Sequence, residues 1–404
     1  MMKLEVVKNW EKSAEECFAQ GDIASMRACG RQILEELPQS PDGLALVAEA
    51  SVYLQDFQTA EQYLDEFWSL PEQHSVKKAN LRGLLAAAVF YGAQYELDKA
   101  LLAYEQLFQG YQERIRQGLS ASRRFISGQP GCTETDRQLI IRGYSFYADT
   151  CLLAGETEKA AEAAFMVSNM LENRAAAAEY FSKGLFLSNY RGAASHALAV
   201  KHAQYGRLYP AQVGFPCDAA VRRSPHALRI GYISPDFRLH AAAYFFTALL
   251  RDGNHTDFSV YAYSAGREDH ITQRFKRMAD HWRNVHGRTP QAIARLIHDD
   301  HIDILVDLSG HSQNSCLPVL AYRPAPVQIS GIGYINTTGL PTVDYFLTDE
   351  CCMPVGEIRH GFTEVPLRLP TATSATGRKP CGSCIHRGIM PLCWQMAILP
   401  LAVS

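Results

Sequence analysis

Residues 228–246 of the 404-residue chain read LRIGYISPDFRLHAAAYFF, and this stretch decides the fold. Its first seven residues form a mostly apolar run that predicts a buried strand, and a polar turn then precedes a helix. Further short runs that predict strands follow at residues 258–264, 302–310, 327–334 and 344–349. Amphipathic stretches such as 269–283 and 290–300 separate them. This alternation predicts a parallel sheet covered on both faces, in which ligands bind beyond the carboxyl ends of the strands.

Residues 10–205 have a different pattern, rich in Ala, Leu, Glu and Gln, with apolar residues at the spacings of three and four typical of helices. Alanines twelve residues apart flank short predicted turns at Ala48 and Ala60, Ala88 and Ala100, and Ala148 and Ala160. Small residues at this separation let two antiparallel helices touch, which favours tetratricopeptide-like repeats. The pairs are offset by 40 and 60 residues instead of the ~34 of regular repeats, so an irregular helical bundle is the alternative.

The composition changes abruptly at residues 207–227, where closely spaced prolines disfavour helix. We therefore predict a multidomain chain in which an all-α, tetratricopeptide-like helical repeat domain precedes an α/β, Rossmann-like lobe. The predicted ranges are 1–205 for the helical domain, 206–227 for a linker and 228–370 for the lobe.

The charge balance argues against nucleic acid as a partner, because 39 Lys and Arg residues face 42 Asp and Glu residues, for a net charge of -3. No apolar run approaches the ~20 residues that a membrane helix needs, and the first ten residues lack the apolar core of a secretory signal. The 11 cysteines are mostly scattered, unlike a disulfide framework. These features predict a cytoplasmic protein that binds neither membranes nor nucleic acid.

Five motifs follow one another along the α/β region. They are GYISPDFRLH at 231–240, DILVDLSG at 303–310, RPAPVQ at 323–328, GYINTTG at 333–339 and DYFLTD at 344–349. In this order they resemble the amino-terminal half of the catalytic region of the O-linked N-acetylglucosaminyltransferase family, which includes the SPINDLY-type proteins. The resemblance runs from about residue 228 to residue 370, and a helical repeat domain immediately upstream is also the family's arrangement.

The resemblance implies a GT-B glycosyltransferase with two Rossmann-like lobes, which transfers a sugar from a UDP-sugar to a protein Ser or Thr with inversion. It implies no cofactor and no metal, because the UDP-sugar is a co-substrate. It also implies an acceptor protein or peptide bound through the helical repeats. One alternative is a non-catalytic, repeat-based protein-interaction module. Another is a UDP-glucose-dependent protein N-glucosyltransferase, from a related branch that usually carries a different helical domain.

The resemblance also indicates individual site residues. His240 occupies the position of the family's active-site histidine, just beyond the first strand, and is the predicted catalytic residue. Asp236 is a predicted substrate-binding residue, with helix capping as the alternative. His298 aligns with a histidine of the family, and a polar helix end is its alternative reading. His311 stands where the family often has tyrosine, which predicts a hydrogen bond near the ligand.

The loop after the strand at 327–334 completes the predicted substrate-binding residues. They are Gly333, Tyr334, Thr337, Thr338 and Gly339. Glycines permit a close approach of the backbone to a ligand, and threonine hydroxyls can donate to a sugar or phosphate. The loop departs from the family's more usual Pro-Gly-Thr-Ser-Gly, because Ile335 and Asn336 replace Pro-Gly.

The resemblance stops at Pro370, where the second lobe of the family would follow. The 34 residues 371–404 contain no Asp or Glu. The codons of residues 371–376, read one base earlier, permit His-Ser-His-Phe-Cys-Tyr, which fits the family's continuation. We therefore expect an out-of-frame or disordered tail and a truncated enzyme whose activity is left open. A zinc knuckle at Cys381, Cys384, His386 and Cys393 is the alternative.

Overall fold

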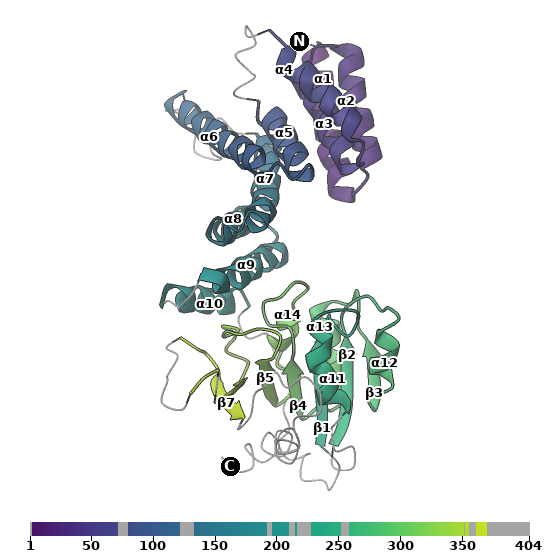
Figure 1. Cartoon of the computed structure of the whole chain (residues 1–404), viewed down its shortest axis with the longest axis vertical. Helices are drawn as coiled ribbons and strands as arrows, with labels where there is room; N and C mark the ends of the chain where they lie inside the picture. Colours follow the sequence, from purple (N-terminus) through teal and green to yellow (C-terminus); the bar gives the residue numbers. More distant parts are fainter. Residues whose placement is uncertain are drawn as a thin grey trace. The chain divides into compact units, whose positions relative to one another are not determined.

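The structure is a computed structural model of the chain (Figure 1). It describes residues 2–71, 80–121, 133–191, 196–209, 215, 228–251, 258–350, 352–354 and 361–369. The predicted tail and most of the predicted linker lie outside these residues. The chain forms two compact units, Met1–Asn173 and Arg174–Ser404, and each is described by itself.

Unit 1 consists of helices that pack against their neighbours in sequence. They are α1 (Met2–Gln20), α2 (Ile23–Glu36), α3 (Pro41–Tyr53), α4 (Phe57–Ser69), α5 (Leu81–Ala93), α6 (Leu97–Ala121), α7 (Glu134–Leu153) and α8 (Thr157–Met170). Helix α3 also packs on α5, and α5 on α7, so the first helices of successive pairs stack. None of the described helices in the chain is long and apolar enough to cross a membrane.

The alanine pairs mark three equivalent helix pairs, α3–α4, α5–α6 and α7–α8. All six alanines are fully buried. Each pair is joined by a three-residue turn whose middle residue has a positive φ, namely 60° at Gln55, 59° at Tyr95 and 79° at Gly155. The repeated turn and the buried small residues together support the predicted helical repeats. The wide spacing of the last two pairs follows from α6, which is 25 residues long.

Unit 2 contains a seven-stranded, fully parallel sheet in the order β3-β2-β1-β4-β5-β6-β7. Its strands are β1 (Leu228–Ser234), β2 (Phe258–Ser264), β3 (His281–Asn284), β4 (Ile304–Asp307), β5 (Val327–Gly331), β6 (Tyr345–Asp349) and β7 (Val365–Leu369). Its helices are α9 (Arg174–Ser188), η2 (Asn189–Arg191), α10 (His196–Leu208), α11 (Ala243–Arg251), α12 (Thr272–Lys276), α13 (Pro290–Asp299) and α14 (Leu317–Leu320). The predicted fold class, a helical repeat region followed by a Rossmann-like α/β lobe, is confirmed.

Two strands were not expected from the sequence. The stretch 269–283 contains the short helix α12 and then the start of β3, because the helical pattern is interrupted before His281. Strand β7 pairs with β6 at the edge of the sheet. The core of the lobe lies where the central strands meet α11 and α12, with Ile230, Phe246 and Phe275 fully buried.

The boundary between the compact units lies earlier in the sequence than the change in composition. The sequence changes character after residue 205, whereas α9 and α10 already belong to the unit that contains the sheet. One reason is a close backbone contact inside unit 2. A Cβ added to Gly206, in α10, would lie 2.0 Å from the carbonyl oxygen of Gly339, in the loop after β5. Gly339 has φ +73°, and a Cβ there would lie 2.0 Å from the carbonyl oxygen of His202.

Gly206→Ala should therefore destabilise unit 2. The new Cβ meets backbone, not a movable side chain, so helix or loop must shift at a cost of about 1–3 kcal/mol. Thermal unfolding followed by circular dichroism should show a lower Tm. The matched control is Gly92→Ala in α5, where the nearest atom, Oγ1 of Thr150, is at an ordinary 3.7 Å. This control should leave the Tm unchanged or raise it slightly, and equal losses from both substitutions would contradict the close contact.

Candidate active site

The strand order reverses at the centre of the sheet. From β1 the sheet continues through β2 and β3 on one side and through β4 to β7 on the other, so β1 and β4 flank the point where the order reverses (Figure 1). Ligands of open parallel sheets bind at such a point, beyond the carboxyl ends of the strands. The segments that follow β1, β4 and β5 contain all of the predicted site residues except His298.

Asp236 and His240 lie together in the segment after β1. The carboxyl of Asp236 is buried, whereas the His240 side chain is 44% exposed. Nδ1 of His240 lies 3.6 Å from Oδ2 of Asp236. Burial raises the pKa of Asp236, and the neighbouring His240 and then Arg238 oppose this rise. The result is an open imidazole with a carboxylate behind it, the arrangement in which a histidine can accept a proton and be stabilised as imidazolium.

The imidazole of His240 has two hydrogen-bonding options. The Ala242 backbone N–H donates to Nδ1 at 3.3 Å, which requires the tautomer with the proton on Nε2. If Nδ1 carries the proton instead, its N–H can face the carboxylate of Asp236, and Nε2 becomes the acceptor. Asp236 makes no described hydrogen bond to the N–H groups of α11, which begins only at Ala243. The alternative reading of Asp236 as a helix cap therefore has no support among the described contacts.

His311 is held inside the protein. It is 1% exposed, and its Nε2 lies 2.9 Å from the carbonyl oxygen of Thr338. Because a carbonyl only accepts, Nε2 carries the proton, and Nδ1 accepts from the hydroxyl of Ser182 in α9 at 2.7 Å. Burial holds the pKa of His311 well below its usual value, so the ring is neutral. Both ring nitrogens thus join α9 to the loop after β5.

Tyr334 makes a second link to the helices. Its hydroxyl is 2.9 Å from Nε2 of His202 in α10 and accepts from Nδ2 of Asn189 at 2.8 Å. Nδ1 of His202 donates to the Leu198 carbonyl at 2.9 Å, so Nε2 must accept from Tyr334. Burial lowers the pKa of His202 to about 4. Asn336 continues the chain of hydrogen bonds by donating to Oδ1 of Asn189 at 2.9 Å.

The threonines of the loop donate inward to Glu364, which the sequence analysis did not single out. Oγ1 of Thr337 is 2.5 Å from one carboxylate oxygen, and the other accepts from the backbone N–H of Thr338 at 2.7 Å and from its hydroxyl. Glu364 is 4% exposed. At Gly333 a Cβ would lie 1.9 Å from the Leu308 carbonyl oxygen, so this glycine allows a close approach to protein backbone. The loop residues predicted to bind substrate therefore make their described contacts within the protein.

A further residue that sequence reasoning missed is Asp307, fully buried at the end of β4. It accepts from the backbone N–H groups of Ser309 and Gly310 and from the hydroxyls of Ser309 and Ser330. Burial raises the pKa of Asp307, and these hydrogen bonds oppose the rise. The carboxylate fixes the turn that carries His311. The signal in the sequence was an acidic residue at the end of an apolar strand.

His298 lies at the other edge of the sheet. It is near the end of α13, which leads into the amino end of β4, and Arg229 at the start of β1 donates to the neighbouring Asp300 carbonyl at 2.9 Å. The His298 ring stacks on Phe215 with centroids 4.7 Å apart. His298 therefore lies toward the amino end of β4, whereas His240 follows the carboxyl end of the parallel strand β1. Among the described residues, no three or more His, Cys, Asp and Glu side chains gather where they could hold a metal ion.

The two buried histidines predict how stability depends on pH. Their pKa values lie below the unfolded-state value of ~6.5, so the unfolded chain binds more protons and stability falls as the pH falls below that value. Each contributes up to about 1.4 kcal/mol per pH unit, for His202 down to about pH 4. His202→Gln should make this loss shallower in urea unfolding at pH 7 and below. The exposed-site control His270→Gln should keep the original slope. An unchanged slope in His202→Gln would contradict the assignment.

Comparisons with known proteins find relatives for part of the chain. Residues 192–372 match the model of glycosyl transferase family 41. The chain is 36% identical over 211 residues to the "Probable UDP-N-acetylglucosamine--peptide N-acetylglucosaminyltransferase SPINDLY" of Arabidopsis thaliana, which covers 50% of this chain and 22% of that protein. It is 26% identical over 191 residues to the "UDP-N-acetylglucosamine--peptide N-acetylglucosaminyltransferase" of Caenorhabditis elegans, over 44% of this chain and 16% of that protein.

Among solved structures, a mutant O-GlcNAc transferase of Thermobaculum terrenum aligns with 92% of this chain and 59% of that chain, at 21% identity and a TM-score of 0.43. The matched part of the chain spans about a fifth of the length of the SPINDLY relatives. The family model covers the α/β lobe and the helix α10 before it. Residues 192–372 therefore belong to glycosyl transferase family 41.

Proposed function

We propose that this lobe takes part in protein O-glycosylation, the transfer of a sugar such as N-acetylglucosamine from a UDP-sugar to a Ser or Thr hydroxyl. The observation that carries the proposal is the half-open imidazole of His240, 3.6 Å from the buried carboxyl of Asp236 and placed at the point where the strand order reverses. The family match and the names of the relatives support the same reaction.

In the proposed reaction the acceptor hydroxyl oxygen forms a bond to the anomeric carbon of the sugar. The bond from that carbon to the diphosphate oxygen breaks, and the diphosphate leaves with the electron pair. The reacting tautomer of His240 carries its proton on Nδ1, which lies 3.6 Å from Asp236, so that Nε2 is free to accept the hydroxyl proton. The carboxylate of Asp236 stabilises the resulting imidazolium. Attack from the face opposite the leaving group inverts the anomeric centre. No metal or other cofactor enters this scheme.

The proposal assigns the acceptor hydroxyl and its proton to this lobe. The leaving diphosphate needs positive or hydrogen-bonding groups, and we propose that a second Rossmann-like lobe supplies them, as the family resemblance implies. On this proposal the described lobe holds one half of the reaction, and the donor sugar is selected by the other. We further propose a cytoplasmic protein whose helical repeats bind the acceptor protein or peptide.

His240→Gln should lower sugar transfer by about 10²–10⁴-fold, the usual contribution of a positioned proton acceptor. The assay measures the transfer of radiolabelled sugar from a UDP-sugar to protein. The enzyme is the protein as the gene naturally encodes it. Asp236→Asn should also lower transfer, because the imidazolium loses its carboxylate. The matched control is His270→Gln, at an exposed histidine of the same unit, which should be active.

Two results would contradict this assignment. One is full transfer by His240→Gln. The other is a wild-type protein that neither transfers sugar nor binds a UDP-sugar yet retains a protein partner through unit 1, because that result favours the non-catalytic interaction module.

A further inference from the structure

The segment that carries Asp236 and His240 is irregular. It consists of residues 235–242, between strand β1 and helix α11. Two of its side chains are open to solvent, since Leu239 is 64% exposed and the side chain of His240 is 44% exposed. The position of His240 therefore depends on how the backbone of this segment is held.

A second segment, residues 265–272, leads from β2 into α12 and holds the first. Strands β1 and β2 are paired in parallel, so the segments that follow them leave the same edge of the sheet. The buried hydroxyl of Thr272 donates to the Phe237 carbonyl at 2.9 Å. A Cβ added to Gly266 would lie 1.9 Å from the Pro235 carbonyl oxygen, so the two backbones are in close contact there.

Asp269 makes a link directly beside His240. Its Oδ2 accepts from the backbone N–H of Leu239, the residue before His240, at 2.7 Å. Its Oδ1 accepts from the backbone N–H groups of Ile271 at 2.9 Å and Thr272 at 3.0 Å. The two carboxylate oxygens thus have separate tasks, since one holds the start of α12 and the other holds the backbone next to His240.

The charge of Asp269 strengthens this link. Burial raises the pKa of Asp269, but hydrogen bonds from backbone N–H groups, that of Leu239 first among them, outweigh this rise and hold the pKa below its usual value. The carboxyl is therefore ionised at neutral pH. Hydrogen bonds to an ionised acceptor are shorter and about twice as strong as neutral ones, and the 2.7 Å distance fits a bond of this kind.

The bond at Leu239 bears on the imidazole because Leu239 and His240 are neighbours in the chain. A shift of the backbone at Leu239 would move His240 and its Nε2, the proposed proton acceptor. It would also change the separation of 3.6 Å between Nδ1 of His240 and the carboxyl of Asp236. In catalysis a displacement of about 1 Å can cost about 10²-fold in rate.

We propose that Asp269 is a positioning residue for His240 and acts through the backbone of Leu239. In the proposed reaction it touches neither the acceptor hydroxyl nor the sugar. The inference rests on the proposed function and adds to it a residue from the segment after β2.

Asp269→Asn tests the link selectively. The amide oxygen can still accept from Ile271 and Thr272, whereas the amide nitrogen meets the N–H of Leu239 as a second donor. In hydrogen exchange followed by NMR, the Leu239 amide should exchange about tenfold faster than in the wild type. The amides of Ile271 and Thr272 should exchange as before. This readout needs neither a sugar donor nor transfer activity.

The kinetic test uses the transfer assay with the protein as the gene naturally encodes it. Asp269→Asn should lower kcat by about 10–100-fold and leave the KM of the acceptor within about twofold. The double variant with His240→Gln should be no slower than His240→Gln alone, because a residue that acts through the imidazole has no effect once the imidazole is gone. A general loss of structure would instead slow transfer by the same factor in both backgrounds.

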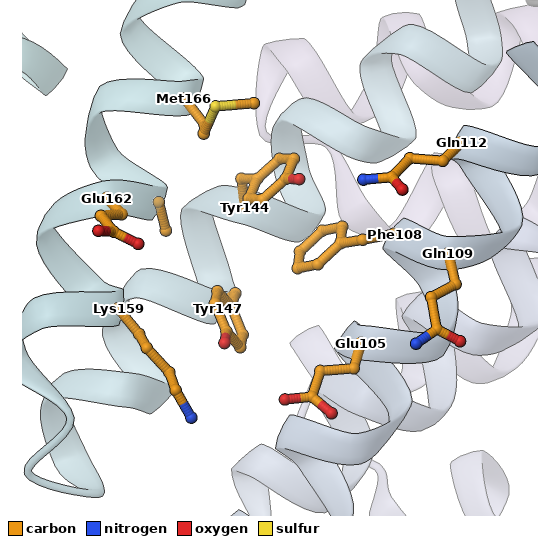
Figure 2. A pocket seen from close by; sticks show the side chains of 10 residues that line it. Glu105, Phe108, Gln109, Gln112, Tyr144, Tyr147, Lys159, Glu162 and Met166 are labelled. Atoms are coloured by element: carbon orange, nitrogen blue, oxygen red, sulfur yellow. The ribbon is translucent and has the colours of Figure 1, made fainter.

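The matched control is Asp280→Asn. Asp280 also accepts from a backbone N–H, that of Val260 in β2, at 2.8 Å. This control removes the same charge from unit 2 and should leave kcat and the exchange of the Leu239 amide unchanged. A second control is Glu105→Gln in unit 1, at the groove between α6, α7 and α8 (Figure 2), and it should also leave that exchange unchanged. Unchanged thermal unfolding of Asp269→Asn checks that it is folded.

Three results would overturn the inference. The first is unchanged exchange of the Leu239 amide in Asp269→Asn. The second is the wild-type kcat in that variant despite faster exchange. The third is an equal loss of kcat from Asp269→Asn in the presence and in the absence of His240. Full transfer by His240→Gln is a different outcome, which contradicts the proposed function and, with it, the role of Asp269.

Discussion

Two buried, uncharged imidazoles hold unit 2 together at the point where its helices meet its sheet. His311 connects Ser182 of α9 to the loop after β5, and His202 of α10 accepts from Tyr334 in the same loop. Each ring also pairs with a backbone carbonyl, which fixes its tautomer. A proton added to either ring would replace an acceptor by a second donor and bury an unpaired charge. The neutral rings therefore connect helices α9 and α10 to the lobe.

This connection also fixes the loop after β5, whose residues are predicted to bind substrate. Thr337 and Thr338 donate hydrogen bonds to Glu364, and Tyr334 bonds to His202 of α10, so other parts of unit 2 hold the loop in place. His240 and Asp236 lie in the segment after β1, beside the point where the strand order reverses.

The sequence predicted the parts of the fold that depend on neighbouring residues. The alanines twelve residues apart predicted the helix pairs, and the short apolar runs predicted five of the seven strands. It did not predict that α9 and α10 belong with the sheet, because a change in composition does not show which surfaces pack. Nor could it find Asn189 as the partner of Tyr334, 145 residues away, or Ser182 as the partner of His311, 129 residues away. The position of His298, by contrast, follows from helix direction, since a helix that leads into a parallel strand ends at that strand's amino edge.

The most direct test of this account is the protonation state of the two buried histidines, measured by nitrogen-15 NMR of the imidazole rings. At about pH 6, where an ordinary histidine is largely protonated, the account predicts two neutral rings of opposite tautomer. His202 should carry its proton on Nδ1 and His311 on Nε2. Titration of either ring near its ordinary pKa, or the same tautomer in both, would contradict the connection on which the architecture of the site depends.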